Sequence, residues 1–278
     1  MPRHGGPLPM LVQLSDPHIV APGRRLLDRV DTPALLAQAV AAVAALQPVP
    51  AAVVLTGDLV DRGTAEEYDH LRSLLAPLPG PVWLMPGNHD DAAVMREVFA
   101  DHDELQPVAG DPALAGHVLW VRQTAGLRVV ALDTVVPRAS HGQLCPARLA
   151  WLARTLDAEP DTPTVLAMHH PPFATGIGHM DAIGLREGAP ELAALLQRHP
   201  QVERVICGHL HRPITRRFGG TLAMTVPSTA HQIVLDLAPD APPAWRLEPP
   251  GYAVHAWLDG ALVSHVATLG DHGPVGLY

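Results

Sequence analysis

The first two thirds of the chain alternate between short β-branched apolar runs and longer segments with helical spacing. This alternation predicts an α/β protein whose helices pack outside buried sheets. Strands are predicted over 10–15, 51–56, 81–85, 164–169 and 202–207, and helices over 32–46, 64–75, 91–100, 146–158 and 189–199. A further pair of strands, 117–123 and 127–133, is expected to join around Gly126.

Two helix starts carry capping signals. Thr32 is predicted to be an N-cap, because Pro33 follows it at the first helical position. Thr64 and Glu67 have the spacing of a capping box, which predicts a helix start at this point.

After residue 212 the sequence consists of short strands separated by Gly and Pro, with a proline-rich loop over 237–251. We expect a catalytic domain over residues 1–236 and a β-rich C-terminal extension over 237–278. The extension would complete the main sheet or form an oligomerisation flap, so a homo-oligomer, a dimer or larger, is expected.

Charge and composition narrow the classes of function. The formal net charge of −9 argues against a broad nucleic-acid surface, because phosphate binding needs clustered Lys and Arg. Cys145 and Cys207 lie far apart and form no C-x-x-C pair, so a reducing, cytoplasmic location is expected. No membrane span is expected, because Gln and Pro residues split the longest apolar tract, 34–57. Prolines interrupt the N-terminal apolar run, so no secretory leader is expected there.

Polar residues gather where the predicted strands end. Such loops can converge on one ligand site in an α/β sheet. If the segments stay extended, the D-x-H and H-x-H spacings direct alternate side chains toward one centre. The collected set is Asp16 and His18, Asp58, Asn88 and His89, His169, and His209 and His211.

This set of oxygen and nitrogen donors suits Mn²⁺, Fe²⁺/Fe³⁺, Zn²⁺ or Co²⁺. The set has more candidate ligands than one tetrahedral ion needs, so two metal ions that share a carboxylate are predicted. Two divalent ions, less the charges of two aspartates and a bridging hydroxide, would leave a net charge of +1, which would match a phosphodiester monoanion.

The same blocks resemble the ordered signature of calcineurin-like metallophosphoesterases: D-x-H, G-D, G-N-H-D/E, H and G-H-x-H. The resemblance covers residues 16–211 and implies a four-layer αββα sandwich with the β-rich C-terminal extension. The blocks stand here as "DPH" from Asp16, "GD" at 57–58, "GNHD" at 87–90, His169, and "GHLH" at 208–211.

Carried onto this chain, the resemblance implies two metal ions bridged by Asp58 and by a hydroxide that attacks phosphorus. It also implies that His89 is catalytic: it would contact the phosphate and protonate the leaving oxygen. The ligands would be Asp16, His18, Asp58 and His211 for one metal, and Asp58, Asn88, His169 and His209 for the other.

Within the family, "MHHPPFATGIGHMD", "VPSTAHQ" and "LEPPGYAVH" look closest to the bacterial class III phosphodiesterases. The expected activity is therefore hydrolysis of small phosphodiesters, either 3′,5′-cyclic nucleotides or glycerophosphodiesters. A phosphomonoesterase of the same fold and an inactive metal-binding scaffold are the alternatives. Intact ligands and His89 weigh against the scaffold.

Further residues receive weaker assignments. His170 is expected to point away from His169 and to pack. Asp61 and Arg62 either orient ligands or form a turn salt bridge. The substrate-binding candidates are Asn88, His89, Phe173, His179, Met180 and His231, and the expected surface histidines are His4, His102 and His272.

Overall fold

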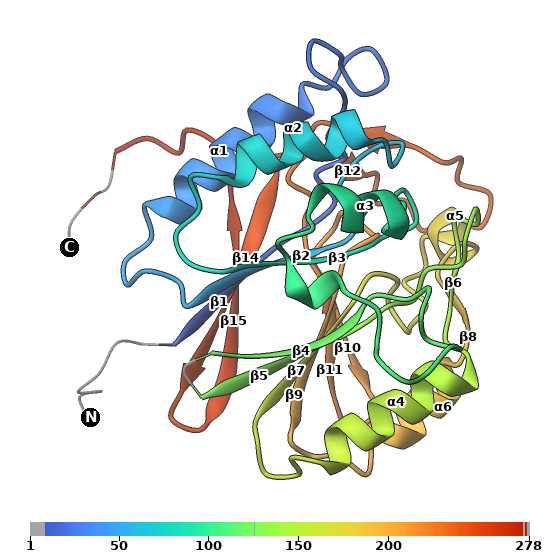
Figure 1. Cartoon of the computed structure of the whole chain (residues 1–278). Helices are drawn as coiled ribbons and strands as arrows, with labels where there is room; N and C mark the ends of the chain where they lie inside the picture. Colours follow the sequence, from blue (N-terminus) through green and yellow to red (C-terminus); the bar gives the residue numbers. More distant parts are fainter. Residues whose placement is uncertain (1–8, 125, 275, 277–278) are drawn as a thin grey trace.

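The computed structural model describes residues 9–124, 126–274 and 276, which form four layers (Figure 1). Two β-sheets pack face to face, and helices cover the outer face of each sheet. This arrangement confirms the predicted αββα sandwich. The helices are α1 (Thr32–Ala44) and α2 (Ala65–Leu75) outside the first sheet, and α4 (Pro146–Asp157) and α6 (Ala189–Leu196) outside the second.

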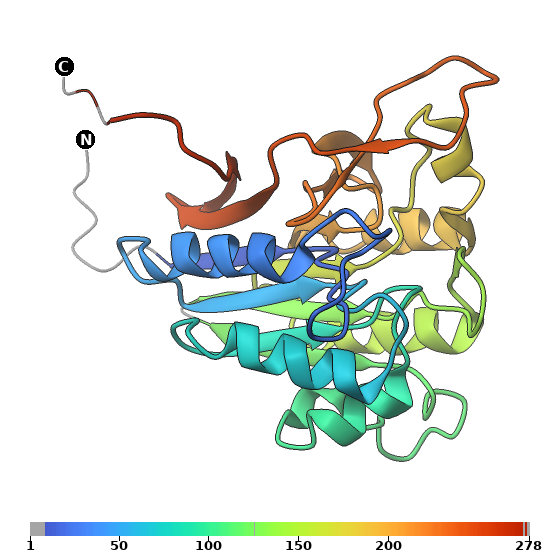
Figure 2. The same cartoon turned by 90° about the horizontal axis from the view of Figure 1, so that it is seen from above.

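The first sheet has five strands in the order β15-β14-β1-β2-β3. Its three N-terminal strands are parallel, while β14 runs antiparallel to β1 and β15 antiparallel to β14. The C-terminal pair, red in Figures 1 and 2, therefore extends the edge that β1 would otherwise leave open. The strands are β1 (Met10–Leu14), β2 (Ala52–Thr56), β3 (Val82–Met85), β14 (Gly251–Leu258) and β15 (Ala261–Thr268).

The second sheet has six strands in the order β10-β11-β9-β7-β5-β4. Its four inner strands are parallel, and an antiparallel strand closes each edge. The strands are β4 (Leu119–Thr124), β5 (Leu127–Leu132), β7 (Thr164–Met168), β9 (Val202–Cys207), β10 (Ile214–Phe218) and β11 (Thr221–Thr225).

Several short elements lie outside these layers. The pairs β6·β8 and β12·β13 form two small sheets. Of the apolar tract 232–237, one of the short strands expected after residue 212, only the first two residues form a strand. These elements are α3 (Ala92–Val98), the 3₁₀ turn η1 (Asp103–Leu105), α5 (Gly178–Asp181), β6 (Gly142–Gln143), β8 (Leu185–Glu187), β12 (Gln232–Ile233) and β13 (Trp245–Arg246).

The hydrophobic core lies between the two sheets and under the helices that cover their outer faces. One cluster fills the space between the sheets, where Val53 of β2 and Ala167 of β7 are fully buried, and it continues under α1 and α2. The other packs Leu152 of α4 and Leu192 of α6 against Leu166 of β7. Burial on both faces explains why the parallel strands are almost uniformly apolar.

The structure corrects one of the two predicted caps. Asp31, not Thr32, caps α1, and its carboxylate accepts a hydrogen bond from the Ala34 N–H at 3.2 Å. Thr32 is buried instead, and its hydroxyl donates to the carbonyl of His18 at 3.0 Å. The capping box of Thr64 and Glu67 on α2 is confirmed.

Other expectations have mixed outcomes. No helix among the residues that the structure describes has the length and apolar character needed to cross a membrane. Of the three histidines expected at the surface, His272 is exposed, His102 is half-buried and His4 lies outside the described residues. The first eight positions, on which the expected absence of a leader partly depends, also lie outside the described residues. The division of the chain at residue 236 stays a prediction.

Candidate active site

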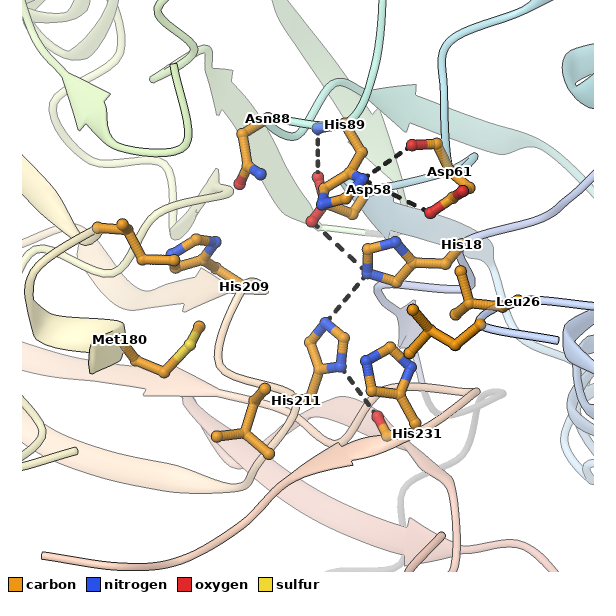
Figure 3. A pocket seen from close by; sticks show the side chains of 13 residues that line it. His18, Leu26, Asp58, Asp61, Asn88, His89, Met180, His209, His211 and His231 are labelled. Carbon is orange, nitrogen blue, oxygen red and sulfur yellow. Dashed lines mark hydrogen bonds and ion pairs between the residues drawn. The ribbon is translucent and has the colours of Figure 1, made fainter. Parts of the chain in front are cut away.

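The polar loops follow the carboxyl ends of β1, β2, β3, β7 and β9 and meet at one end of the two sheets. Figure 3 shows part of this group: His18, Asp58, Asn88, His89, His209 and His211. Six of the eight predicted residues are buried there. Asn88 is half-buried, and His89 is exposed toward the pocket. The buried members are Asp16, His18, Asp58, His169, His209 and His211.

Asp58 lies at the centre of this group. Its Oδ2 is 3.6 Å from Nε2 of His18, and its Oδ1 is 3.4 Å from Nε2 of His169. His169 Nε2 also lies 3.1 Å from Oδ1 of Asn88. The two carboxylate oxygens of Asp58 therefore face two separate sets of donors.

Asp16 organises the loop after β9. Its carboxylate accepts the backbone N–H of His209 at 2.9 Å, and its Oδ1 lies 3.5 Å from Nε2 of His211. His211 Nε2 is in turn 3.2 Å from Nε2 of His18. This second set joins loops that are almost two hundred residues apart in sequence.

Backbone carbonyls fix the orientation of two imidazoles. Nδ1 of His169 lies 2.8 Å from the Thr56 carbonyl, and Nδ1 of His211 lies 2.9 Å from the His231 carbonyl. Because a carbonyl only accepts, each Nδ1 carries a proton, and in the neutral ring Nε2 is the nitrogen with the free lone pair. This is the tautomer that metal-binding histidines adopt through such contacts.

Electrostatics keep the carboxylates ionised. Burial alone would raise the pKa of Asp58, but the imidazoles of His169 and His89 outweigh it and hold the pKa well below its ordinary value. Burial would lower the pKa of His169, but the Asp58 carboxylate prevails and raises it to about 9. Burial lowers the pKa of His209 to about 3. A cation would therefore meet ionised carboxylates and would displace a proton from His169.

The donors fit a dinuclear centre of divalent metal ions. Nε2 of His209 is buried and has no hydrogen-bond partner among the described residues, which is an unusual state for a polar atom. Candidate ligand atoms within 4.8 Å of one another form three groups among the described residues. They are Asp16, His18, Asp58 and His211; His169, His170 and His209; and His18, Asp61 and His89.

The expected extended backbone at these spacings is wrong. Five of the site residues take left-handed backbone conformations, which residues other than Gly, Asn and Asp rarely adopt. Alternation along a strand therefore does not explain why the side chains converge. The φ angles are 51° at Asp16, 44° at His18, 48° at Asp58, 69° at His209 and 49° at His211.

Glycines precede the site residues because no side chain fits there. A Cβ at Gly87 would lie 2.2 Å from Oδ1 of Asp58, and one at Gly208 would lie 2.4 Å from Oγ of Ser15. Both distances are far below van der Waals contact. The glycines of "GNHD" and "GHLH" thus allow the loops to approach each other closely.

His89 is held at its backbone N–H by a carboxylate and at its ring by a backbone carbonyl. Its N–H donates to Oδ1 of Asp58 at 2.9 Å, and its Nδ1 lies 2.8 Å from the Asp61 carbonyl. Burial would lower the pKa of His89, but Asp58 and the Asp61 carbonyl outweigh it and raise the pKa. Nδ1 donates to the carbonyl, so Nε2 is free to act on a ligand. Arg62 Nε lies 3.5 Å from Asp61 Oδ2, so the turn salt bridge occurs, whereas orientation of a metal ligand by this turn stays a prediction.

Tyr68 and Asp90 support the loops and were not predicted. The Asp90 carboxylate accepts the backbone N–H groups of Leu59 and Gly87 at 3.0 and 2.8 Å, and the Tyr68 hydroxyl at 2.9 Å. Asp90 therefore ties the loop of Asp58 to the loop of Asn88. Asp90 could have been identified from the sequence as the fourth residue of "GNHD". Tyr68 could not, because nothing in the sequence around it on α2 indicates a contact with these loops.

His170 does not point away from His169 as expected. The two rings lie 4.8 Å apart between centroids, and the ring of His170 is 4.6 Å from that of His209. Nδ1 and Nε2 of His170 lie 2.8 and 3.2 Å from Thr134 Oγ1 and the Ser140 carbonyl. Both nitrogens are therefore engaged, and His170 packs against the two imidazoles.

A pocket of about 220 Å³ opens beside these residues. Met180 and His231 line it together with Asn88 and His89. Phe173 packs against the second core cluster, and His179 is not among the lining residues. Substrate binding by these candidates stays a prediction. The lining also includes Leu26, Leu27, Ile183 and Ile233, for which the sequence carried no signal because each lies in a short or irregular segment.

Comparison with known proteins places this geometry among phosphoesterases. Residues 10–213 match the profile of the family described as calcineurin-like phosphoesterase. A probable glycerophosphodiester phosphodiesterase of Arcobacter nitrofigilis is 34% identical over 271 residues, which cover 97% of each chain. A probable cyclic nucleotide phosphodiesterase of Rhodopseudomonas palustris is 37% identical over 267 residues, which cover 95% of this chain and 94% of that one.

Solved structures share the fold at low sequence identity. A dimetal phosphatase from Danio rerio superposes with a TM-score of 0.66 at 15% identity, covering 95% of this chain and 100% of that chain. A purple acid phosphatase from yellow lupin gives 0.67 at 15% identity and covers 96% of this chain and 52% of the lupin chain. These likenesses support the fold alone.

Proposed function

Because this chain belongs to the calcineurin-like phosphoesterase family, we propose that it is a metal-dependent phosphodiesterase acting on small phosphodiesters. The similar proteins are named as glycerophosphodiester and cyclic nucleotide phosphodiesterases, and they align with nearly the whole chain. Both 3′,5′-cyclic nucleotides and glycerophosphodiesters are therefore candidate substrates.

One observation carries the proposal: the two carboxylate oxygens of Asp58 face different imidazoles, at 3.6 Å for His18 and 3.4 Å for His169. A carboxylate placed in this way can serve two cations at once. We assign Asp16, His18, Asp58 and His211 to one metal ion, and Asp58, Asn88, His169 and His209 to the other.

When bound, the metal pair supplies an activated water and charge stabilisation for the phosphoryl oxygens. The protein's own part is to hold a proton at Nε2 of His89. The Asp61 carbonyl fixes the ring by accepting from Nδ1, so Nε2 is the ring nitrogen left to carry this proton toward the pocket that His89 lines. His89 then donates this proton to the departing alkoxide.

The pocket favours a diester over a monoester. Among the described residues, no lysine or arginine lines it, and the Asp61 carboxylate is part of its wall. The second negative charge of a monoester would therefore meet a carboxylate and no side-chain cation other than a protonated imidazole. The accessible pocket beside a full donor set also weighs against an inactive scaffold.

Finer assignments belong to the same proposal. The donor set accepts Mn²⁺, Fe²⁺/Fe³⁺, Zn²⁺ or Co²⁺, and supply in the cell would decide among them. A cytoplasmic location is supported by Cys145 and Cys207, both of which are free thiols. A homo-oligomer formed through the C-terminal extension stays a prediction.

The direct test is hydrolysis of bis(4-nitrophenyl) phosphate and 4-nitrophenyl phosphate by protein reconstituted with Mn²⁺. We expect kcat/KM to be at least tenfold higher for the diester, and activity to disappear on removal of metal with a chelator. A higher kcat/KM for the monoester would favour the phosphomonoesterase. Bound metal without turnover of either ester would favour the scaffold.

A further inference from the structure

Two groups of apolar side chains flank the active-site pocket. The lip flank is Leu26 and Leu27, from the loop after β1, and the helix flank is Met180, Ile183 and Ile233, from α5, its following turn and β12. We propose that each flank receives one of the two ester groups of a diester, so that the enzyme selects apolar or aromatic groups there. This inference depends on the proposed phosphodiesterase activity.

The lip flank presents an exposed leucine next to a buried one. Leu26 is buried in a small cluster with Val20 and Val30, and its backbone bridges to Val30. Leu27 follows with φ of 51° and is 55% exposed, although it lines the pocket. A left-handed, solvent-exposed leucine raises the free energy of the folded protein in two ways, through backbone strain and through contact of its apolar surface with water. A ligand that covers Leu27 would remove the second contribution.

The helix flank is built on a separate cluster. Met180 is buried with Ile177 and Leu210, and Ile183 and Ile233 pack against them while remaining half-buried. The helix flank is therefore an apolar surface that packs against a buried cluster.

An ion pair fixes Ile233 in this flank. Arg212 Nη1 donates to the Ile233 carbonyl at 2.6 Å and to Oε2 of Glu248 at 2.8 Å. Arg212 therefore connects β12 to Glu248, which follows β13 in the chain.

The two flanks lie on opposite sides of the imidazoles. In Figure 3, Leu26 and Met180 stand on either side of the group around His211, with Asn88 and His89 at the far rim. A phosphorus atom bound at this group would direct one ester oxygen toward each flank. Apart from His89 and the residues assigned to the metal ions, the polar side chains in the lining are Asp61 and His231, so among these described residues a polyhydroxylated ester group finds few partners.

The experiment varies one ester group while the leaving group stays constant. Metal-reconstituted enzyme is assayed with methyl, phenyl and thymidin-5′-yl esters of 4-nitrophenyl phosphate. We expect kcat/KM for the phenyl ester to exceed that for the methyl ester about tenfold. A thymidin-5′-yl ester as good as the phenyl ester would identify a nucleoside as the apolar group, whereas one as poor as the methyl ester would identify a simple hydrocarbon.

Two variants then separate the flanks. Leu27→Asn keeps a residue that tolerates the left-handed backbone while removing the apolar surface, and Ile183→Thr keeps the β-branched shape. We expect one variant to reduce the phenyl-to-methyl ratio to about threefold or less, and the other to lower kcat/KM for both esters by similar factors. Leu247→Asn, at a residue that is 63% exposed and outside this pocket, is the matched control and should leave the ratio unchanged.

The outcomes separate this inference from the activity on which it depends. If the wild-type enzyme hydrolyses none of the esters, the phosphodiesterase assignment itself fails. If it hydrolyses the methyl and phenyl esters equally well, or if both variants leave the ratio and kcat/KM unchanged, only the flank assignment is overturned.

Discussion

Asp58 and His18 illustrate what the loop backbone contributes to the site. Each takes a left-handed conformation that costs of the order of 1–3 kcal/mol. Cross-loop hydrogen bonds hold the strained backbone in place: His18 N–H donates to the Asp58 carbonyl at 3.0 Å, and Asp16 N–H donates to the Gly57 carbonyl at 3.1 Å. The identities of these residues were predictable from sequence. Their backbone conformations were not, because contacts with a distant loop determine the sign of φ.

At the residue scale, His89→Ala separates proton donation from metal binding. We expect the variant to retain its metal ions and to lose roughly 10²–10⁴-fold in kcat toward diesters with alkoxide leaving groups. The loss should be much smaller for a 4-nitrophenolate leaving group, which needs no proton. Metal analysis and kcat on the two kinds of diester measure this. His272→Ala, at an exposed position, is the control. Equal losses on both diesters would argue against a role as acid.

At the scale of elements, long helices and buried strands were predictable and short ones were not. Strand β9 lies where its apolar run predicted, and α2 starts at its capping box. The elements α5, β6, β8 and β12 have two to four residues each, too few to show periodicity in sequence. The N-cap of α1 was misassigned because Asp31 and Thr32 are both good caps, and only the contact with the His18 loop distinguishes them.

This correction makes a prediction that compares the two neighbours. Asp31→Ala removes the cap of α1 and should lower the free energy of unfolding by about 1 kcal/mol, with unchanged metal affinity. Thr32→Val keeps the side-chain shape but leaves the buried carbonyl of His18 without its 3.0 Å donor. It should weaken metal binding several-fold. Chemical denaturation and metal titration measure the two effects, and a Thr32→Val protein with wild-type metal affinity would contradict the account.

For the whole molecule, a buried polar chain connects the two sheets. Gln13 of β1 donates through Nε2 to Thr56 Oγ1 at 2.9 Å and to the Cys207 carbonyl of β9 at 3.0 Å. Its Oε1 faces Nε2 of His255 on β14 at 3.1 Å. The layered architecture could be predicted from the sequence, but these contacts could not, since two of them join positions 194 and 242 residues apart.

His255 makes global stability depend on pH. Burial, with a smaller effect of the nearby Arg204, lowers the pKa of His255 to about 3 from an ordinary value of 6.5. Because the folded pKa is depressed, this stabilisation is fully present above pH 6.5 and is lost as the pH falls toward the folded pKa. The free energy of unfolding should therefore fall by about 2 kcal/mol between neutral pH and pH 5 on account of this residue.

Chemical denaturation at several pH values tests this for His255→Gln and for His265→Gln, a control at an exposed position of the neighbouring strand β15. The His255 variant should have the shallower pH dependence, and the control should match the wild type. If His255→Gln shows the wild-type slope, the buried neutral imidazole is not the cause.

The central claim, two cations held around Asp58, is tested most directly by metal stoichiometry after equilibrium dialysis against Mn²⁺. We predict two ions per wild-type chain and fewer than one per Asp58→Ala chain, with two retained by Asp240→Ala, which changes an exposed carboxylate. A wild-type protein that binds no ion or only one, or an Asp58→Ala protein that still binds two, would contradict the account.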